Sequence, residues 1–196
     1  MQLIERLDAA RERWNLLEHP FYKRWNCGEL CRDELAWYAG EYRHAVVALA
    51  ETAAKTGNQE HAREESDHVR LWDDFAAAFD ADTTGEPSPE TRECVVAWTA
   101  PGHRLEALAV MYAIEAGQPA VSQTKLDGLA DHYGVAGDEP GAAYFVLHAE
   151  LDHEHAASSR AALEAHSGDE DRLVELAENA LRGNWILLDG AEARTK

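Results

Sequence analysis

Apolar residues recur at helical spacing along almost the whole chain, and no segment alternates apolar and polar residues as a half-buried strand does. Proline and glycine interrupt this pattern and divide the chain into about seven helices. The pattern therefore predicts an all-α fold. Helical segments are expected at about residues 2–17, 31–57, 58–80, 89–99, 103–117, 119–134, 139–166 and 169–188, with a short helix in the segment EHPFYKRW.

A length of 196 residues is enough to bury a substantial core, and nothing in the chain demands a second domain. The segment DADTTGEPSPE is rich in Asp, Thr, Gly and Pro, which favour turns. We expect it to form a surface loop rather than a linker between domains. The chain is therefore predicted to be one domain over 1–196.

The charge of the chain is strongly acidic, with 37 acidic against 18 basic residues and a formal net charge of -19. Such a charge repels phosphate backbones and anionic membranes, so we expect neither nucleic acid nor membrane as a partner. A hydrophobic content of 45% and six Trp residues exclude a disordered polyelectrolyte. An acidic, Arg-biased composition also suits a salt-adapted cell.

The N-terminal segment MQLIERLDAARERW is an amphipathic, charged helix without the apolar centre of a signal peptide, and no later run reaches a membrane-spanning length. We therefore expect a cytoplasmic protein. A reducing compartment would keep Cys27, Cys31 and Cys94 as thiols. Cys27 and Cys31 lack the further pair of ligands that a structural zinc site needs.

The strongest chemical signal is the segment YFVLHAELDHEHAA, in which His148, Asp152 and His155 stand at positions i, i+4 and i+7 of a predicted helix. At about 100° per residue, this spacing puts all three on one face. The apolar residues before them indicate burial, where an unpaired carboxylate would be costly. Two imidazoles around a carboxylate suit iron or manganese. The alternative is a solvated acidic helix that happens to contain histidines.

A second cluster lies in AREESDHVRLW, where Glu65 and His68 have the Glu-x-x-His spacing found in carboxylate-bridged di-iron bundles. Glu64 is four residues before His68 and can reach the same place. The apolar residues that follow put His68 close to a buried stripe. A surface coincidence in an acidic helix remains the alternative for this pattern taken alone.

A third candidate ligand is Glu115, which ends one of the most apolar helices in the sequence. A carboxylate in such surroundings lies either at a solvated helix end or next to a cation. Glu41, in the segment YAGEYRHAV, is a weaker candidate for a further carboxylate ligand.

These segments together resemble a known family. The combination of EHPFYKRW, EE--H--LW, YAIEAGQPAVSQTKLDGL and YFVLH---D--H looks like the haem-oxygenase-like di-metal oxidases, and within them like the chlamydial death-domain-associating protein family of 4-aminobenzoate synthases, which are related to the PqqC-like proteins. The similarity covers about Leu17 to His155. It implies a seven-helix haem-oxygenase-like bundle without haem.

The resemblance also implies a cofactor of two Fe ions, or a mixed Mn/Fe pair, with O2 as co-substrate and an external reductant. The first Glu and the His are usually further apart in the resembling sequences, which leaves Glu64 and Glu65 both open, although the spacing to His68 favours Glu65. Carried over by position, the metal ligands are a Glu of the pair Glu64/Glu65, His68, Glu115, His148, Asp152 and His155.

The same resemblance points to two residues outside the ligand set. Members that make 4-aminobenzoate are understood to consume a Tyr of the HPFY segment for the ring and a Lys after the Glu ligand for the amine. The matching residues are Tyr22 and Lys125. Their alternative roles are ordinary, namely a packing aromatic and a surface cation.

Three functions follow as hypotheses. The first is a self-sacrificing 4-aminobenzoate synthase that uses Tyr22 and Lys125. The second is a multi-turnover di-iron oxygenase acting on a small amine, amino acid or fatty acid. The third is a thiaminase-like hydrolase or a metal-free interaction protein; the hydrolase needs a nucleophilic Cys, and the 111–117 segment has none. Bundles of the resembling family often pair, so a homodimer is expected.

Overall fold

The computed structural model describes residues 2–165 and 169–194, and these residues form helices and connecting loops without any strand. In chain order the elements are α1 (Leu3–Arg13), a 3-10 turn (Leu16–Glu18), α2 (Pro20–Asn26), α3 (Arg32–Lys55), α4 (Gln59–Ala78), α5 (Pro89–Thr99), α6 (Arg104–Glu115), α7 (Gln118–Gly128), a π-helical turn (Leu129–Tyr133), a second 3-10 turn (Pro140–Ala142), α8 (Ala143–Glu164) and α9 (Glu170–Glu192).

The all-α prediction is confirmed, and most predicted boundaries differ from these by a few residues. The short helix predicted in EHPFYKRW is α2, and with it the helices of the described part outnumber the approximate total of seven. The first predicted helix is too long, since α1 ends at Arg13 and the Asn15 side chain caps a separate 3-10 turn. The predicted break at 166–168 lies outside the described residues.

Helix starts follow from local capping chemistry. The Asn58 side chain accepts hydrogen bonds from two backbone N–H groups at the start of α4, and the Ser88 side chain does the same for one at the start of α5. His19 caps α2, with Pro20 at the first helical position. These caps fix where α4 begins and hence which of its side chains face α8.

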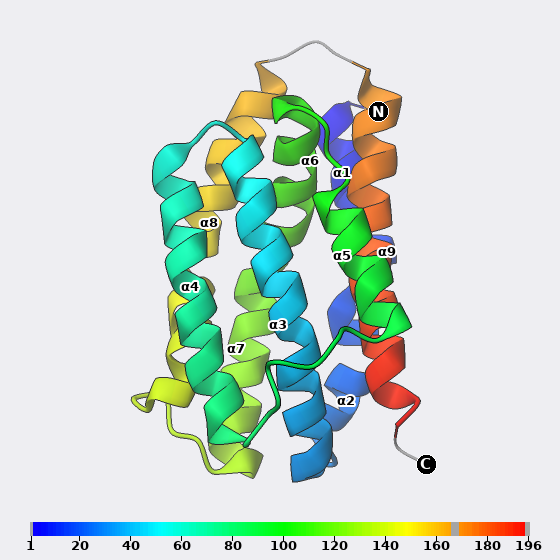
Figure 1. Cartoon of the computed structure of the whole chain (residues 1–196). Helices are drawn as coiled ribbons and strands as arrows, with labels where there is room; N and C mark the ends of the chain where they lie inside the picture. Colours follow the sequence, from blue (N-terminus) through cyan, green and yellow to red (C-terminus); the bar gives the residue numbers. More distant parts are fainter. Residues whose placement is uncertain (1, 166–168, 195–196) are drawn as a thin grey trace.

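The helices pack side by side in one bundle, with α1 starting at the upper end and α9 finishing at the lower end (Figure 1). Helix α6 lies inside the bundle, in contact with α3, α8 and α9, and every residue from Glu106 to Glu115 is buried. Helices α4 and α8 run in opposite directions next to each other (Figure 1). The C-terminal end of α6 thus meets the facing sides of α4 and α8.

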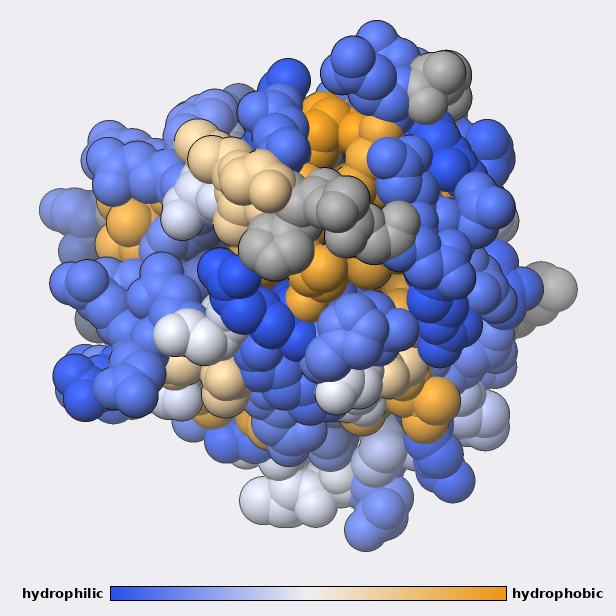
Figure 2. All heavy atoms as spheres, turned by 90° about the horizontal axis from the view of Figure 1, so that it is seen from above, coloured by the Kyte–Doolittle hydropathy of each residue, from blue (hydrophilic) through white to orange (hydrophobic). Residues whose placement is uncertain are grey.

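The core is rich in aromatic side chains: Tyr22, Trp25, Tyr38, Trp72 and Phe145 are at most 1% exposed. They belong to the larger of two apolar clusters, while the smaller one joins α1 to α6, α8 and α9. The upper end of the bundle is mostly hydrophilic, with small apolar areas between polar side chains (Figure 2). No described helix is long and apolar enough to cross a membrane.

The segment between α4 and α5 is a loop, as predicted, and it crosses the outer side of α3 (Figure 1). It lies so close to α3 that a Cβ atom at Gly40 would stand 2.4 Å from the Asp82 carbonyl oxygen. A glycine is therefore required at this crossing.

Candidate metal centre

Seven imidazole and carboxylate side chains from three helices meet at the place where α6 ends between α4 and α8. All are at most 9% exposed. The predicted ligands are all among them, and His61 joins them as a residue that the sequence analysis missed. The seven are His61, Glu65 and His68 of α4, Glu115 of α6, and His148, Asp152 and His155 of α8.

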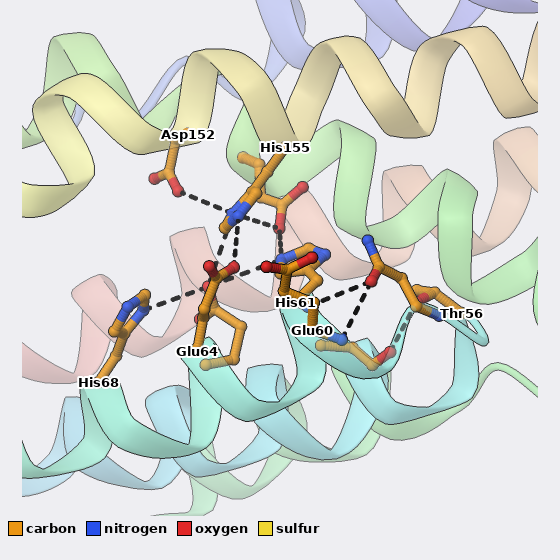
Figure 3. A network of polar contacts seen from close by, with 11 residues as sticks. Thr56, Glu60, His61, Glu64, His68, Asp152 and His155 are labelled. Atoms are coloured by element: carbon orange, nitrogen blue, oxygen red, sulfur yellow. Dashed lines mark hydrogen bonds and ion pairs between the residues drawn. The ribbon is translucent and has the colours of Figure 1, made fainter.

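Helices α4 and α8 carry the same pattern, a His, a carboxylate four residues later and a second His three residues after that. On α4 this is His61, Glu65 and His68, as on α8 it is His148, Asp152 and His155. Because the two helices are antiparallel, the first His of one faces the second His of the other. The rings of His61 and His155 are 3.8 Å apart, and those of His68 and His148 are 4.7 Å apart. The cluster thus has two ends, each with a pair of imidazoles. Figure 3 shows His61 beside His155 at one end and His68 at the other.

One end of the cluster consists of His61, His155, Glu65 and Glu115. The His61 Nε2 atom lies 2.8 Å from Glu115 Oε1 and 3.6 Å from Glu65 Oε1. The His155 Nδ1 atom lies 3.8 Å from Glu65 Oε1 and 4.0 Å from Glu115 Oε1. One donor atom from each of these four residues lies within 4.8 Å of the others, which is close enough for a single ion to contact all of them.

The other end consists of His68, His148 and Glu65. The His68 Nδ1 atom lies 3.3 Å from Glu65 Oε1. The His148 Nδ1 atom donates a hydrogen bond of 2.6 Å to the Tyr144 carbonyl oxygen, which leaves Nε2 free to bind. Glu65 belongs to both ends, so its carboxylate is placed to bridge two ions.

The cluster lacks the partners that buried polar atoms normally have. Each of its seven residues has at least one buried side-chain nitrogen or oxygen atom without a hydrogen bond in the described structure. Such atoms are costly to bury, and a cation that binds both nitrogen and oxygen satisfies them together. The donor set, four imidazoles and three carboxylates, fits iron or manganese.

The pKa values of the carboxyl groups depend on burial and on their neighbours. Burial raises the pKa of Glu115 to about 7 against the opposing effect of His61. Burial, together with the charges of Glu115 and Glu65, raises the pKa of Asp152 well above its usual range. Burial also opposes ionisation of Glu65, but the neighbouring imidazoles of His61 and His68 prevail and hold its pKa well below the usual value.

The pKa values of the histidines diverge within the cluster. Burial lowers the pKa of His148 to about 4. For His61 the effect of burial is outweighed by Glu115 and Glu65, which raise the pKa to about 10. His61 and His148 thus differ because His61 Nε2 lies beside the carboxylates of Glu115 and Glu65, which offset the effect of burial.

The structure places Glu64 and Glu65 differently. Glu65 lies inside the cluster, whereas the Glu64 side chain is 38% exposed and its Oε2 atom lies 3.1 Å from His155 Nε2 (Figure 3). A carboxylate on the outer nitrogen of a metal-binding His fixes the ring and its tautomer. Glu64 is thus placed to position His155, and Glu65 to contact an ion.

Lys125 lies in a chamber of aromatic rings that adjoins the cluster. It is 1% exposed, and its Nζ atom is 4.9 to 5.6 Å from five ring centroids. Burial lowers its pKa to about 7. A surface position for Lys125 is therefore ruled out. The rings are those of Tyr22, Tyr38, Tyr42, Trp72 and Phe145.

Tyr22 forms part of this chamber and is fully buried. Its hydroxyl group lies 3.4 Å from that of Tyr38. Burial raises its pKa well above the usual value, so the phenol stays protonated. Tyr144 connects the chamber to the cluster, because its ring stacks on His148 at 3.9 Å and meets Trp72 edge-on at 4.9 Å.

A family model described as "Iron-containing redox enzyme" matches residues 33–189, most of the chain and all seven residues of the cluster. The chain belongs to this family. The segment that this family model matches therefore contains all the donor groups that distances and burial bring together. The predicted resemblance to the haem-oxygenase-like oxidases is confirmed.

Two named relatives match this chain over nearly its full length. It is 28% identical to a protein from Chlamydia muridarum named "4-aminobenzoate synthase", over 96% of this chain and 89% of the relative. It is 27% identical to a protein of the same name from Nitrosomonas europaea, over 95% of this chain and 89% of the relative.

The fold has solved counterparts as well. A protein from Shewanella denitrificans described as having a heme oxygenase-like fold superposes with a TM-score of 0.78, at 18% identity over 98% of this chain and 93% of that one. The haem-oxygenase-like fold expected from the resemblance is thus confirmed.

Two of the weaker candidates lie elsewhere. The Glu41 carboxylate accepts a hydrogen bond of 2.9 Å from the Ser88 backbone N–H, so it supports the start of α5 and is not grouped with the cluster. Cys94 is buried against Gly183 of α9, and burial raises the pKa of its thiol far above the usual value. This thiol is not an activated nucleophile of the kind that a thiaminase-like hydrolase needs.

His61 was missed although the sequence contained a signal for it. It stands four residues before Glu65 and seven before His68, the same spacing that identified the α8 residues. Comparing the two helices for a shared pattern, rather than testing each for a known motif, would have found it.

Proposed function

We propose that this iron-containing redox enzyme is a 4-aminobenzoate synthase that makes its product from its own Tyr22 and Lys125. The observation that carries the proposal is the position of Lys125, a buried amine in a chamber that it shares with Tyr22 and that adjoins the seven-residue cluster. The names of the full-length relatives support the same product.

In this proposal the cluster would hold two Fe ions, or a Mn/Fe pair, and Glu65 would be a ligand that its two ends share. His61, His155 and Glu115 complete one end, and His68 and His148 complete the other. Asp152 has its Oδ1 atom 3.8 Å from His155 Nδ1 and is the remaining carboxylate ligand. Such a pair, kept reduced by an external reductant, would supply the activation of O2.

The chamber residues prepare the two groups that are consumed. With a pKa of about 7, Lys125 is present in large part as the neutral amine near neutral pH, the form that can supply nitrogen. Tyr22 provides an electron-rich phenol within the same chamber, 5.6 Å from Lys125 Nζ to the ring centroid. The surrounding rings exclude water, which would otherwise compete for reactive species.

The experiment traces isotope labels from the tyrosine and lysine side chains of the protein into the product. Protein grown with ring-¹³C tyrosine and ε-¹⁵N lysine is loaded with Fe(II) without oxygen, then exposed to O2 and a reductant. The expected product is 4-aminobenzoate carrying both labels, in a yield of about one per chain, with an intact mass that shows loss of the Tyr22 side chain. Tyr133→Phe is the control for the loss of a tyrosine elsewhere in the chain. Tyr133 lies outside the chamber, so this variant should leave the yield unchanged.

The competing function is a multi-turnover oxygenase of the same family with an external small amine, amino acid or fatty acid as substrate. It predicts that Tyr22→Phe keeps most of the activity and that active protein retains its full mass. Unlabelled product, or an unchanged Tyr22 after turnover, would contradict the synthase.

A further inference from the structure

A cavity of about 230 Å³ lies between the C-terminal part of α1, the junction of α6 and α7, and α9, apart from both the cluster and the Lys125 chamber. Its walls are mostly apolar, and they include the indole ring of Trp14. Its polar lining includes one cationic side chain, Arg11, together with the amides of Gln118 and Asn184. A space of this size suits a small molecule.

Two residues of this lining have unsatisfied polar atoms. Outside the seven-residue cluster, the buried side-chain atoms that lack a hydrogen bond in the described residues are Arg11 Nε and Asn184 Oδ1. Both residues line the cavity, and Asn184 is only 2% exposed. If the Asn184 amide is turned over, its nitrogen is left without a partner instead, so one polar atom of this side chain is unsatisfied in either orientation.

The two atoms call for different partners. The Arg11 guanidinium donates to Asp8 at 2.9 Å and to the Ala116 carbonyl oxygen at 3.4 Å, which leaves Nε as a charged donor for an acceptor in the cavity. Asn184 offers an acceptor for a donor group. An apolar body fits between the two. Glu12 also lines the cavity and disfavours a second negative charge on the ligand.

Tyr42 and the amides of Gln118 and Asn184 lie between the cavity and the Lys125 chamber. The two amides line the cavity, and Asn184 donates a hydrogen bond of 3.3 Å to the Tyr42 hydroxyl group. The Tyr42 ring faces the chamber, since its centroid is 5.0 Å from Lys125 Nζ. A molecule formed in the chamber would enter the cavity by displacing Tyr42 and one of these amides.

We propose that this cavity is a binding site for a small aromatic monocarboxylic acid, with the carboxylate on Arg11 and a donor group on Asn184. That the bound acid is the reaction product, on its way out past Tyr42, rests on the proposed function. The binding site itself does not, because it follows from the cavity and its unsatisfied atoms.

The test measures binding to the metal-free full-length chain, which makes no product. Calorimetric titration with 4-aminobenzoate should give saturable binding of one molecule per chain, and the indole NMR signal of Trp14 should shift with the same affinity. Titration with 4-aminobenzamide, which lacks the charge, should be at least about tenfold weaker, because a charge-assisted hydrogen bond is lost. This comparison needs no substitution and so does not depend on variants that fold.

Two variants then locate the site. Arg11→Gln and Asn184→Leu should each weaken binding of 4-aminobenzoate by about tenfold. The control Arg182→Gln removes a cation from α9 that is 50% exposed and pairs with Glu93, and it should bind normally. Circular dichroism and melting curves identify any variant that has unfolded.

Absence of saturable binding to the wild-type chain, or equal binding of the acid and the amide, would overturn the proposed site. So would affinities that do not change in both folded variants. Failure of the synthase proposal gives a different result, since Tyr22 would survive turnover while the metal-free chain still bound the acid.

Discussion

The seven-residue cluster and the Lys125 chamber are neighbours in one core, and they deal with buried charge in opposite ways. In the cluster, three carboxylates lie among imidazoles, and its polar atoms stay unsatisfied without a cation. In the chamber, one amine lies among five rings, and burial lowers its pKa until the proton is largely lost near neutral pH. One region is built to take up positive charge and the other to lose it. A buried ionisable group therefore does not by itself indicate a metal site.

The largest effect is expected from removing the carboxylate that both ends of the cluster share. Glu65→Gln should lower the affinity for Fe(II) by more than about 100-fold, because a ligand of both ions loses its charge. Iron content after anaerobic loading and desalting measures this loss.

Glu64→Gln is the matched control for Glu65→Gln, since the two residues are adjacent on α4. A Gln side chain can still accept a hydrogen bond from His155, so iron binding should weaken by no more than about tenfold. Equal losses of iron in the two variants would show that Glu64 and Glu65 contribute equally to iron binding.

An effect of the opposite sign, a gain in stability, is expected in the chamber. Lys125→Met should stabilise the metal-free protein by on the order of 5 kcal/mol at pH 6, the free energy that corresponds to lowering a lysine pKa from 10.5 to about 7. Urea unfolding measures the gain. Lys23→Met replaces a lysine that is 59% exposed and should change the free energy of unfolding by no more than about 0.5 kcal/mol. A destabilised Lys125→Met protein would show that burial of the Lys125 amine does not cost stability.

The smallest effect is the dependence of this gain on pH. The unfolded chain keeps the Lys125 proton up to about pH 10.5, whereas the folded chain loses it near pH 7. The wild-type protein is therefore stabilised as pH rises through this interval. The difference between wild type and Lys125→Met should be full below pH 7 and should shrink toward zero near pH 10.5. A difference that stays constant from pH 6 to 10 would show that Lys125 remains charged.

The two regions also differ in how far the sequence predicts them. His148, Asp152 and His155 could be placed on one face because their spacing is local and the residues before them are apolar. The same reasoning left Glu64 and Glu65 open, because adjacent helical residues differ only in which neighbour they face. The packing of α4 on α8 decides this. Glu41 could not be placed for the same reason, since the loop after α4 determines what it contacts.

Lys125 shows the limit of local patterns. The residues of α7 have no clear apolar face, and nothing near Lys125 in the sequence indicates burial. Its surroundings come from α2, α3, α4 and α8, so the chamber exists only once these helices are packed. The cavity beside α1 depends equally on long-range packing.

The complete burial of Tyr22 has a consequence for the lifetime of the protein. If its side chain is consumed, the chain becomes a large-to-small core variant of itself, with a void where a ring packed against Phe21 and Tyr38. Truncating a buried aromatic side chain typically costs about 3 to 5 kcal/mol, a large part of the stability of an ordinary domain. A chain that has reacted once would thus unfold more readily than a fresh one, and cellular proteases would remove spent molecules selectively.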